Sequence, residues 1–132
     1  MSRPVKERAL PFTRESHKHL FTETIFLLGN GKSRENYNLE SLRKHGTIIG
    51  CNALYRDFAP DILVAIDAKM INEIDNAGYN DDHLVVVPAN RNAGRRNLYR
   101  WRVDGFNTSG CFSMKLISQL MKPKKCYMLG MD

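Results

Sequence analysis

A short run of residues near the start of the chain has the composition of a phosphate- or nucleotide-binding turn. Four apolar residues, 25–28, are followed by Gly-Asn-Gly, and an apolar pattern of helical spacing with Leu39 and Leu42 comes next. A strand, a glycine turn and a helix start bring backbone N–H groups and the positive end of a helix dipole together, which favours an anion. The candidate binding residues of this turn are Gly29, Asn30, Gly31, Lys32 and Ser33. An equally weighted interpretation is a tight strand-to-helix turn that binds nothing.

Other polar residues stand where further apolar segments end or where a helix begins. Asn52 ends one apolar segment and Asp67 ends the next, and Asp132 follows the last. A second helix-start signal consists of Thr108, Ser109 and Gly110. An asparagine amide is both donor and acceptor, which suits ribose hydroxyls. Because ligands of parallel α/β sheets bind at the carboxyl ends of the strands, we expect these positions to converge on one rim.

The elements that must position these residues alternate along the chain. Near-continuous apolar segments predict strands at 24–28, 47–52, 61–67, 84–87 and 124–130, and helical spacing predicts helices at 33–44, 69–76 and 111–121. Buried strands alternating with helices indicate a parallel sheet covered on both faces. We therefore expect an α/β fold, a Rossmann-like parallel sheet of about five strands with helices on both faces. It would occupy residues 24–132, preceded by a basic N-terminal arm at 1–23.

Two common phosphate-binding motifs are disfavoured. A P-loop needs a glycine five residues before its Gly-Lys, and that position is Phe26. The dinucleotide fingerprint needs a third glycine where Arg34 stands, and Asn52 occupies the place of the expected acidic ribose ligand. Neither Gly-x-Ser-x-Gly nor His-Glu-x-x-His occurs. No catalytic residue is therefore assigned.

Basic residues concentrate in the N-terminal arm and in the predicted loop 89–107. The formal net charge is +6 and the pI is about 9.4, which suits an anionic partner. A candidate phosphate lid in this loop consists of Arg95, Arg96, Tyr99 and Arg100. Trp101 has two interpretations of equal weight, stacking on a base or packing in the core. Binding of nucleic acid through the loop and the arm stays open.

The sequence also predicts where in the cell the protein is located. No apolar run approaches the length of a membrane-spanning helix, and the charged N-terminus lacks the apolar core of a signal peptide, so we expect a cytoplasmic protein without membrane insertion.

The cysteines Cys51, Cys111 and Cys126 form no Cys-x-x-Cys pair. We expect three buried thiols.

The order of the short motifs resembles one group of enzymes. Gly29-Asn30-Gly31-x-Ser33, Cys51-Asn52, Thr108-Ser109-Gly110 and a final Leu-Gly-Met-Asp at 129–132 resemble the bacterial sialyltransferases that use CMP-sialic acid. The chain is also similar to the wider Rossmann-like group of archaeal hydroxymethylpterin pyrophosphokinases and flagellin-modifying transferases, whose Pro-Asp…Asp strand corresponds to Pro60-Asp61 and Asp67. The resemblance covers roughly residues 24–132.

The resemblance implies a role for each matching residue. Asn30 and Gly31 would hold the donor phosphate or ribose, Asn52 would contact the nucleotide, and residues 108–110 would contact the base or sugar. Lys32 stands where the Gly-Asn-Gly-Pro-Ser motif of the sialyltransferases has proline, and Asp67 stands where those enzymes have asparagine. The histidine and tyrosines of those enzymes follow the strand that ends here at Asp132. We therefore expect either a chain truncated at its C-terminus or a minimal relative that binds without that chemistry.

Three functions follow as expectations. The first is a nucleotide- or nucleotide-sugar-binding domain of glycosyltransferase type with a CMP-linked donor and no certain cofactor. The second is a nucleotidyl or pyrophosphoryl transferase in which Asp67 and Asp132 hold Mg²⁺ between phosphates. The third is a non-catalytic protein that binds nucleic acid or a protein partner.

Overall fold

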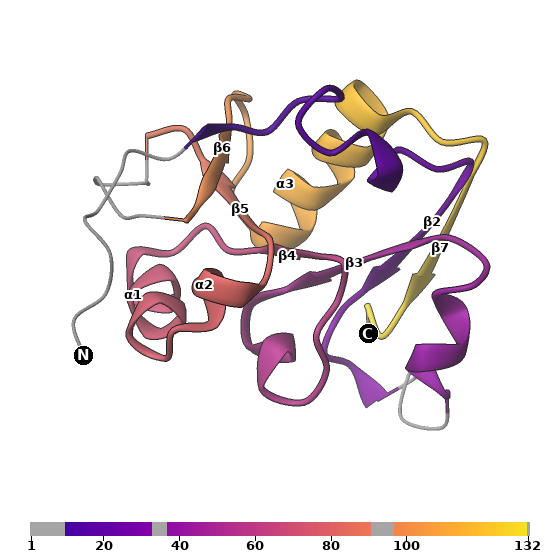
Figure 1. The fold of residues 1–132 in the computed structure, drawn as a ribbon, viewed down its shortest axis with the longest axis horizontal. Helices are drawn as coiled ribbons and strands as arrows, with labels where there is room; N and C mark the ends of the chain where they lie inside the picture. The colour runs from indigo at the N-terminus through magenta and orange to yellow at the C-terminus, as the bar shows by residue number, and fades with distance from the viewer. Residues whose placement is uncertain (1–9, 33–36, 91–96, 132) are drawn as a thin grey trace.

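The protein folds around one parallel sheet. The computed structural model describes residues 10–32, 37–90 and 97–131. Within this part of the chain, seven strands pair in the order β1-β6-β5-β4-β3-β2-β7, and every pairing is parallel (Figure 1). The strands are β1 (Leu10–Pro11), β2 (Thr24–Leu28), β3 (Thr47–Cys51), β4 (Ile62–Val64), β5 (Val85–Pro88), β6 (Tyr99–Trp101) and β7 (Lys125–Leu129). The predicted α/β class with a Rossmann-like parallel sheet is confirmed.

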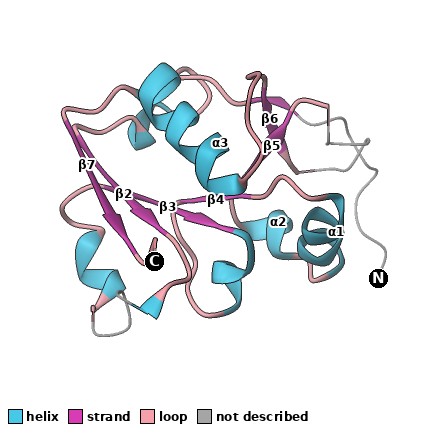
Figure 2. Ribbon diagram, turned by 180° about the vertical axis from the view of Figure 1, so that it is seen from behind, coloured by secondary structure: helices cyan, strands magenta, loops and turns pink. Residues whose placement is uncertain are grey.

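Helices lie on both faces of this sheet. The α-helix α3 (Ser109–Lys115) continues directly into the π-helix η5 (Leu116–Met121) on one face, and α1 (Ala68–Asn76) and α2 (Tyr79–Asp82) lie on the other (Figure 2). Short 3₁₀ turns complete the described helices: η1 (Lys18–Leu20), η3 (Leu39–Leu42) and η4 (Asn52–Arg56).

The two-sided cover explains why the central strands are apolar throughout. Successive side chains of a strand point to opposite faces. Ile25 and Leu27 of β2 accordingly belong to a core cluster with Phe112 of α3. Phe26 and Leu28 belong to a second cluster, with Leu54 of η4. Both sets are buried, so each position along β2 gains apolar contacts.

The predicted number of about five strands is wrong, because two short strands lie in segments with no apolar run. The first is β1, in the predicted arm, where the N–H of Phe12 donates to the carbonyl of Arg100 at 2.8 Å. The second is β6, in the predicted basic loop. Two- and three-residue strands are too short for a periodic pattern, so tertiary pairing alone reveals them.

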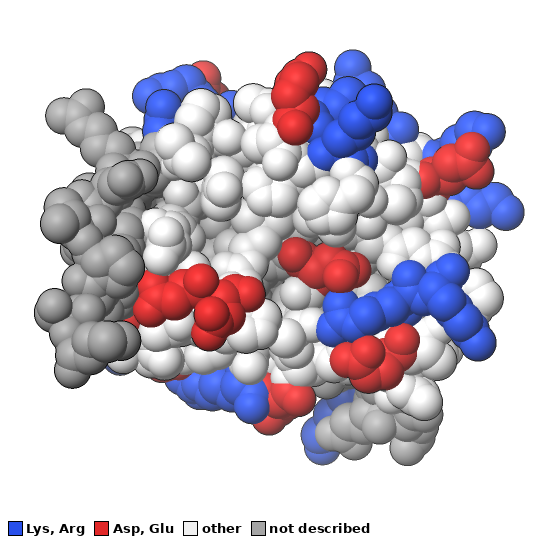
Figure 3. Space-filling view, viewed as in Figure 1, with Lys and Arg blue, Asp and Glu red and all other residues white. Residues whose placement is uncertain are grey.

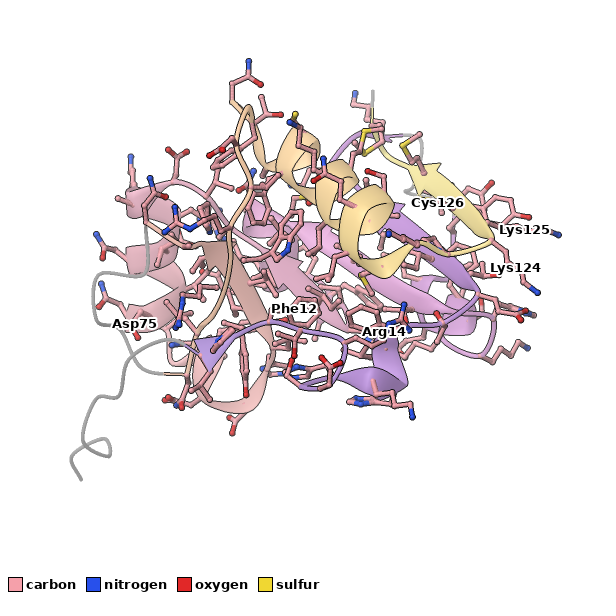
Figure 4. The ribbon with its side chains drawn as sticks, turned by 90° about the horizontal axis from the view of Figure 1, so that it is seen from above. Phe12, Arg14, Asp75, Lys124, Lys125 and Cys126 are labelled. Atoms are coloured by element: carbon pink, nitrogen blue, oxygen red, sulfur yellow. The ribbon has the colours of Figure 1, made fainter. Side chains whose placement is uncertain are left out.

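The N-terminal arm is part of the folded body from Leu10 onward. Phe12 is 2% exposed and packs in the core below α3, and Figure 4 shows it within the protein. Trp101 of β6 lies edge-on to Phe112, with ring centroids 5.6 Å apart. Of the two interpretations of Trp101, the structure supports packing in the core.

The helix predicted at 33–44 is replaced, among the described residues, by the 3₁₀ turn η3. Its apolar side chains are Leu39 and Leu42, which both pack on the cluster below β2 and β3. In a 3₁₀ helix, side chains three residues apart lie on the same side, so this turn places both leucines against the same cluster. The Ser41 hydroxyl donates to the carbonyl of Asn38 at 2.6 Å and reinforces the turn.

The expectation of three buried thiols holds for Cys51 alone. Cys111 is partly buried and Cys126 is exposed. Cys126 lies on β7, at the outer edge of the described sheet (Figure 4). An edge strand lacks a neighbour on one side, which leaves Tyr127 and Met128 about half exposed as well.

We predict that Phe12→Ala lowers the free energy of unfolding by about 3–5 kcal/mol, because it leaves a cavity under α3. Leu10→Ala is the matched control, since Leu10 lies in the same strand region but is 53% exposed, and it should cost less than about 1 kcal/mol. Urea unfolding measures both. Equal losses for the two variants would show that residues 10–12 do not anchor the arm.

His17, one of two histidines in the arm, makes the stability of the protein dependent on pH. The ring of His17 lies edge-on to Tyr99 at 4.6 Å, and its Nδ1 lies 2.8 Å from the Ser16 hydroxyl. Burial, with a smaller effect of His19, lowers the pKa of His17 below its ordinary value of 6.5. The unfolded chain therefore takes up a proton at a higher pH than the folded protein does.

We predict that the free energy of unfolding decreases as the pH falls through about 6.5 and becomes constant, for this group, below the lowered pKa of folded His17. Urea unfolding between pH 7.5 and 5 measures the slope. His17→Gln should reduce that slope, while a variant with the slope of the parent protein would contradict the assignment.

Candidate nucleotide-binding site

A hollow of about 390 Å³ lies at the carboxyl ends of β2, β3 and β7, beside the start of α3. Its lining residues come from four segments that are distant in the sequence. They are Gly29, Asn30, Gly31, Cys51, Asn52, Ser109, Gly110, Gly130 and Met131. The predicted convergence of strand ends is thus present for β2, β3 and the second helix start.

A side-chain hydrogen bond joins two of these segments. The amide Nδ2 of Asn52 donates to the hydroxyl of Ser109, with 2.8 Å between the nitrogen and the oxygen. Asn52 has a φ of 55°, in the left-handed region that asparagine tolerates better than most residues. This conformation turns the chain sharply where β3 ends, and the bond then fixes Asn52 against the first turn of α3.

A buried thiol lies behind this pair. The sulfur of Cys51 is 3.3 Å from the Ser113 hydroxyl and 4.0 Å from the carbonyl oxygen of Ser109. Burial raises the pKa of the Cys51 thiol, and the two serine contacts oppose that rise only in part. A thiol of raised pKa is protonated at neutral pH and is a poor nucleophile. Cys51 therefore packs β3 against α3.

The glycine turn has a structural role besides any binding role. The N–H of Gly29 donates to the carbonyl of Leu129 at 2.8 Å, and the N–H of Gly31 donates to that of Gly130 at 2.7 Å. A Cβ on Gly29 would overlap the carbonyl oxygen of Gly130. Glycine is required here because the end of β2 lies against the end of β7. The same approach holds Asn30 at the hollow, with its Nδ2 3.5 Å from the carbonyl of Cys51.

The start of α3 supplies backbone donors. The Thr108 hydroxyl accepts the N–H of Cys111 at 3.0 Å and caps the helix. The first turn of a helix has N–H groups without intrahelical partners, and those of Ser109 and Gly110 belong to it. The helical segment continues through η5, so its dipole is that of a longer helix than α3 alone. An anionic group is favoured at this position.

The described residues that line the hollow are uncharged. Its polar groups are two asparagine amides, a serine hydroxyl and backbone groups, and Met131 supplies an apolar side chain. Such a lining binds by hydrogen bonds and by contact with an apolar surface. Elsewhere, acidic and basic side chains are intermixed over the face shown in Figure 3.

Several predicted site residues do not line the hollow. Lys32 is exposed, Asp67 is exposed at the start of α1, and Thr108 serves as the helix cap. Tyr99 and Arg100 of the predicted lid belong to β6, where Tyr99 packs on His17. Their positions follow from strand pairing that the sequence pattern did not reveal. The remaining predicted residues, Ser33, Arg95, Arg96 and Asp132, lie outside the described residues.

Three lining residues were not predicted as site residues: Cys51, Gly130 and Met131. The available signal was the position of each at the end of an apolar segment. Met131 follows Leu-Gly in the same way as Asn30 follows Leu-Gly, and its methyl carbon would lie 3.7 Å from a Cβ on Gly110. The parallel between the two strand ends is therefore visible in the sequence.

Metal binding is not indicated by the part of the chain that the structure describes. There, no group of three or more His, Cys, Asp or Glu side chains is arranged to hold a metal ion. The predicted pair of Asp67 and Asp132 stays a prediction, because Asp132 lies outside the described residues.

The sequence matches no family model and no curated protein. Among the described residues, no helix has both the length and the apolar character needed to cross a membrane.

We predict that Gly29→Ala lowers the free energy of unfolding by at least about 2 kcal/mol, because a new Cβ would push β2 away from the backbone of β7. Gly110→Ala is the matched control in the same hollow. Its Cβ would make only an ordinary contact with Met131, so stability should change by less than about 1 kcal/mol. Thermal and urea unfolding measure both variants, and a Gly29→Ala protein as stable as the parent would contradict the close approach.

Proposed function

We propose that this chain binds a nucleotide or nucleotide-sugar in the 390 Å³ hollow and is the donor-binding domain of a glycosyltransferase-like protein. The observation that carries the proposal is the Asn52–Ser109 hydrogen bond, which holds a strand end and a helix start together at the rim of a parallel sheet. That rim is where open α/β sheets bind their ligands.

The size and chemistry of the hollow support a nucleotide. Its volume falls within the range of small-molecule sites. Asn30 and Asn52 offer donors and acceptors for ribose hydroxyls, and the first turn of α3 favours a phosphate. Met131 offers an apolar surface for a base. Each part of a nucleoside phosphate thus has a counterpart within the lining.

The preference for a CMP-linked donor rests on the resemblance to the sialyltransferases. Direct transfer from such a donor needs the phosphate to be held and its charge to be stabilised as the bond to the sugar breaks. Backbone N–H groups of Ser109 and Gly110 are the proposed source of that stabilisation. We assign no general base.

The absence of charge among the described lining residues favours a donor that binds without a metal ion. A nucleotidyl or pyrophosphoryl transferase would need carboxylates beside the phosphates to hold Mg²⁺, and Asp67 lies outside the lining of the hollow.

Thermal unfolding with CMP, CDP, GTP or ATP, each with and without Mg²⁺, distinguishes these functions. Stabilisation by CMP without metal supports the proposal. Stabilisation by triphosphates only with Mg²⁺ would support the metal-dependent transferase instead.

We predict that saturating CMP raises the melting temperature of the parent protein by several degrees, as expected when a ligand binds only the folded state. Asn52→Gly should abolish this rise, because glycine keeps the left-handed backbone and removes the amide. Ser109→Ala should weaken the rise.

The matched control for this prediction is Asn97→Gly. Asn97 also has a left-handed φ, 58°, and its amide also donates to a side chain, Asp81 Oδ1 at 2.9 Å. It lies outside the hollow, so its variant should keep the full CMP-dependent rise. Equal rises in both variants would remove Asn52 from the site. If no nucleotide stabilises the parent and DNA or RNA binds with a steep salt dependence, the nucleic-acid function replaces the proposal.

A further inference from the structure

A second hollow, of about 150 Å³, lies at the carboxyl ends of the neighbouring strands β5 and β6. Pro88, the last residue of β5, is at one side, and Arg102, which follows the last residue of β6, is at the other. The volume suits a small molecule of a few heavy atoms. None of its lining residues belongs to the nucleotide hollow.

The two hollows share the same rim of the sheet. One continuous segment borders both, because residues 102–106 line the smaller hollow and Ser109 and Gly110 line the larger. In the strand order, β5 and β6 are separated from β2 and β3 by β4. At about 4.8 Å between neighbouring strands, the two sites are roughly 14 Å apart.

Two residues of opposite charge line the smaller hollow. Arg102 and Asp104 both line it, both are exposed, and neither side chain forms an ion pair or hydrogen bond with any described residue, including each other. Asp104 is held instead through its main chain, whose carbonyl accepts from the Lys115 ammonium at 2.8 Å. Among the described lining residues, one is a cation and one is an anion.

The remaining lining residues are uncharged. Phe106 lies edge-on to Phe112 of the core, with ring centroids 5.1 Å apart. Gly105 has a φ of 76°, a conformation that glycine adopts without strain, and it turns the chain between Asp104 and Phe106. The amide of Asn90 adds a neutral donor and acceptor.

We propose that this hollow binds a small zwitterion, an α-amino acid or the terminal ammonium and carboxylate of a similar compound. The guanidinium of Arg102 pairs with the carboxylate, a geometry in which two parallel hydrogen bonds form. Asp104 accepts from the ammonium group. Asp104 repels a phosphate or a free carboxylate, and Arg102 repels a polyamine. A ligand that carries charge of one sign alone is therefore disfavoured. A neutral sugar forms only the weaker uncharged hydrogen bonds.

Chemical-shift mapping on the full chain tests the proposal, with glycine, L-alanine and L-serine as probes. Propionate, ethylamine and glucose serve as probes that carry only the carboxylate, only the ammonium, or neither. We expect saturable shifts of the Val103 and Gly105 amides in the millimolar range with at least one amino acid, and at least tenfold weaker binding of the other three probes. Absence of saturable shifts with all three amino acids, or equal binding of propionate or glucose, would overturn it.

Substitutions test the assignment of the two charges. Arg102→Gln and Asp104→Asn should each weaken amino-acid binding at least tenfold, while Arg14→Gln, a change of another exposed arginine outside this hollow, should leave it unaltered. Unaltered binding in Arg102→Gln would overturn the proposal. Both variants should keep the CMP-dependent rise in melting temperature, so this result is independent of the nucleotide site.

Discussion

Every central strand of this protein must bury both of its faces, and the rest of the structure depends on that constraint. A parallel sheet leaves no face to solvent, so alternate residues of β2 pack under α3 and over η4. The connections between parallel strands must cross from one end of the sheet to the other, and they carry the helices that provide this cover. Polar residues are then confined to the strand ends, where the chain leaves the sheet. The position of the candidate site follows from this confinement.

The same contacts build both the fold and the hollow. The thiol of Cys51 packs β3 against α3, and Asn52, the next residue, bonds to Ser109 at the start of that helix. Gly29 lets β2 approach β7, and Asn30, again the next residue, lines the hollow. In each case a packing residue is followed by a polar one. Side chains fixed in this way lose little conformational freedom when a ligand binds.

The sequence predicted the parts of the fold that rest on long apolar segments. The runs at 25–28 and 47–51 become β2 and β3 because burial on two faces selects continuous apolar residues. The short strands β1 and β6 escaped prediction, since Leu10–Pro11 is exposed and Tyr99–Trp101 lies among arginines. Their pairing depends on residues distant in the sequence, as with Phe12 and Arg100. Local propensity carries no information on such contacts.

The site was predicted in part for a related reason. Asn30, Asn52 and Ser109 converge because the carboxyl ends of parallel strands meet on one rim. Asp67 also follows a strand, β4, but it stands three residues beyond the end of that strand, exposed and in the extended backbone that precedes α1. Asn52 directly follows β3, and its left-handed φ of 55° places its amide within hydrogen-bond distance of Ser109 at the start of α3. Asn52 and Asp67 therefore look alike in sequence and differ in the structure.

One wall of the hollow belongs to the last strand of the described sheet, and this couples ligand affinity to order at the sheet edge. Gly130 and Met131 follow β7, which is hydrogen-bonded to β2 on one side only. Edge strands open more readily than central ones, and each opening removes this wall. A bound ligand that contacts this wall must shift the opening equilibrium toward the closed state by the same free energy by which opening weakens ligand binding. Amide hydrogen exchange in β7 is therefore a direct reporter of whether the hollow is occupied.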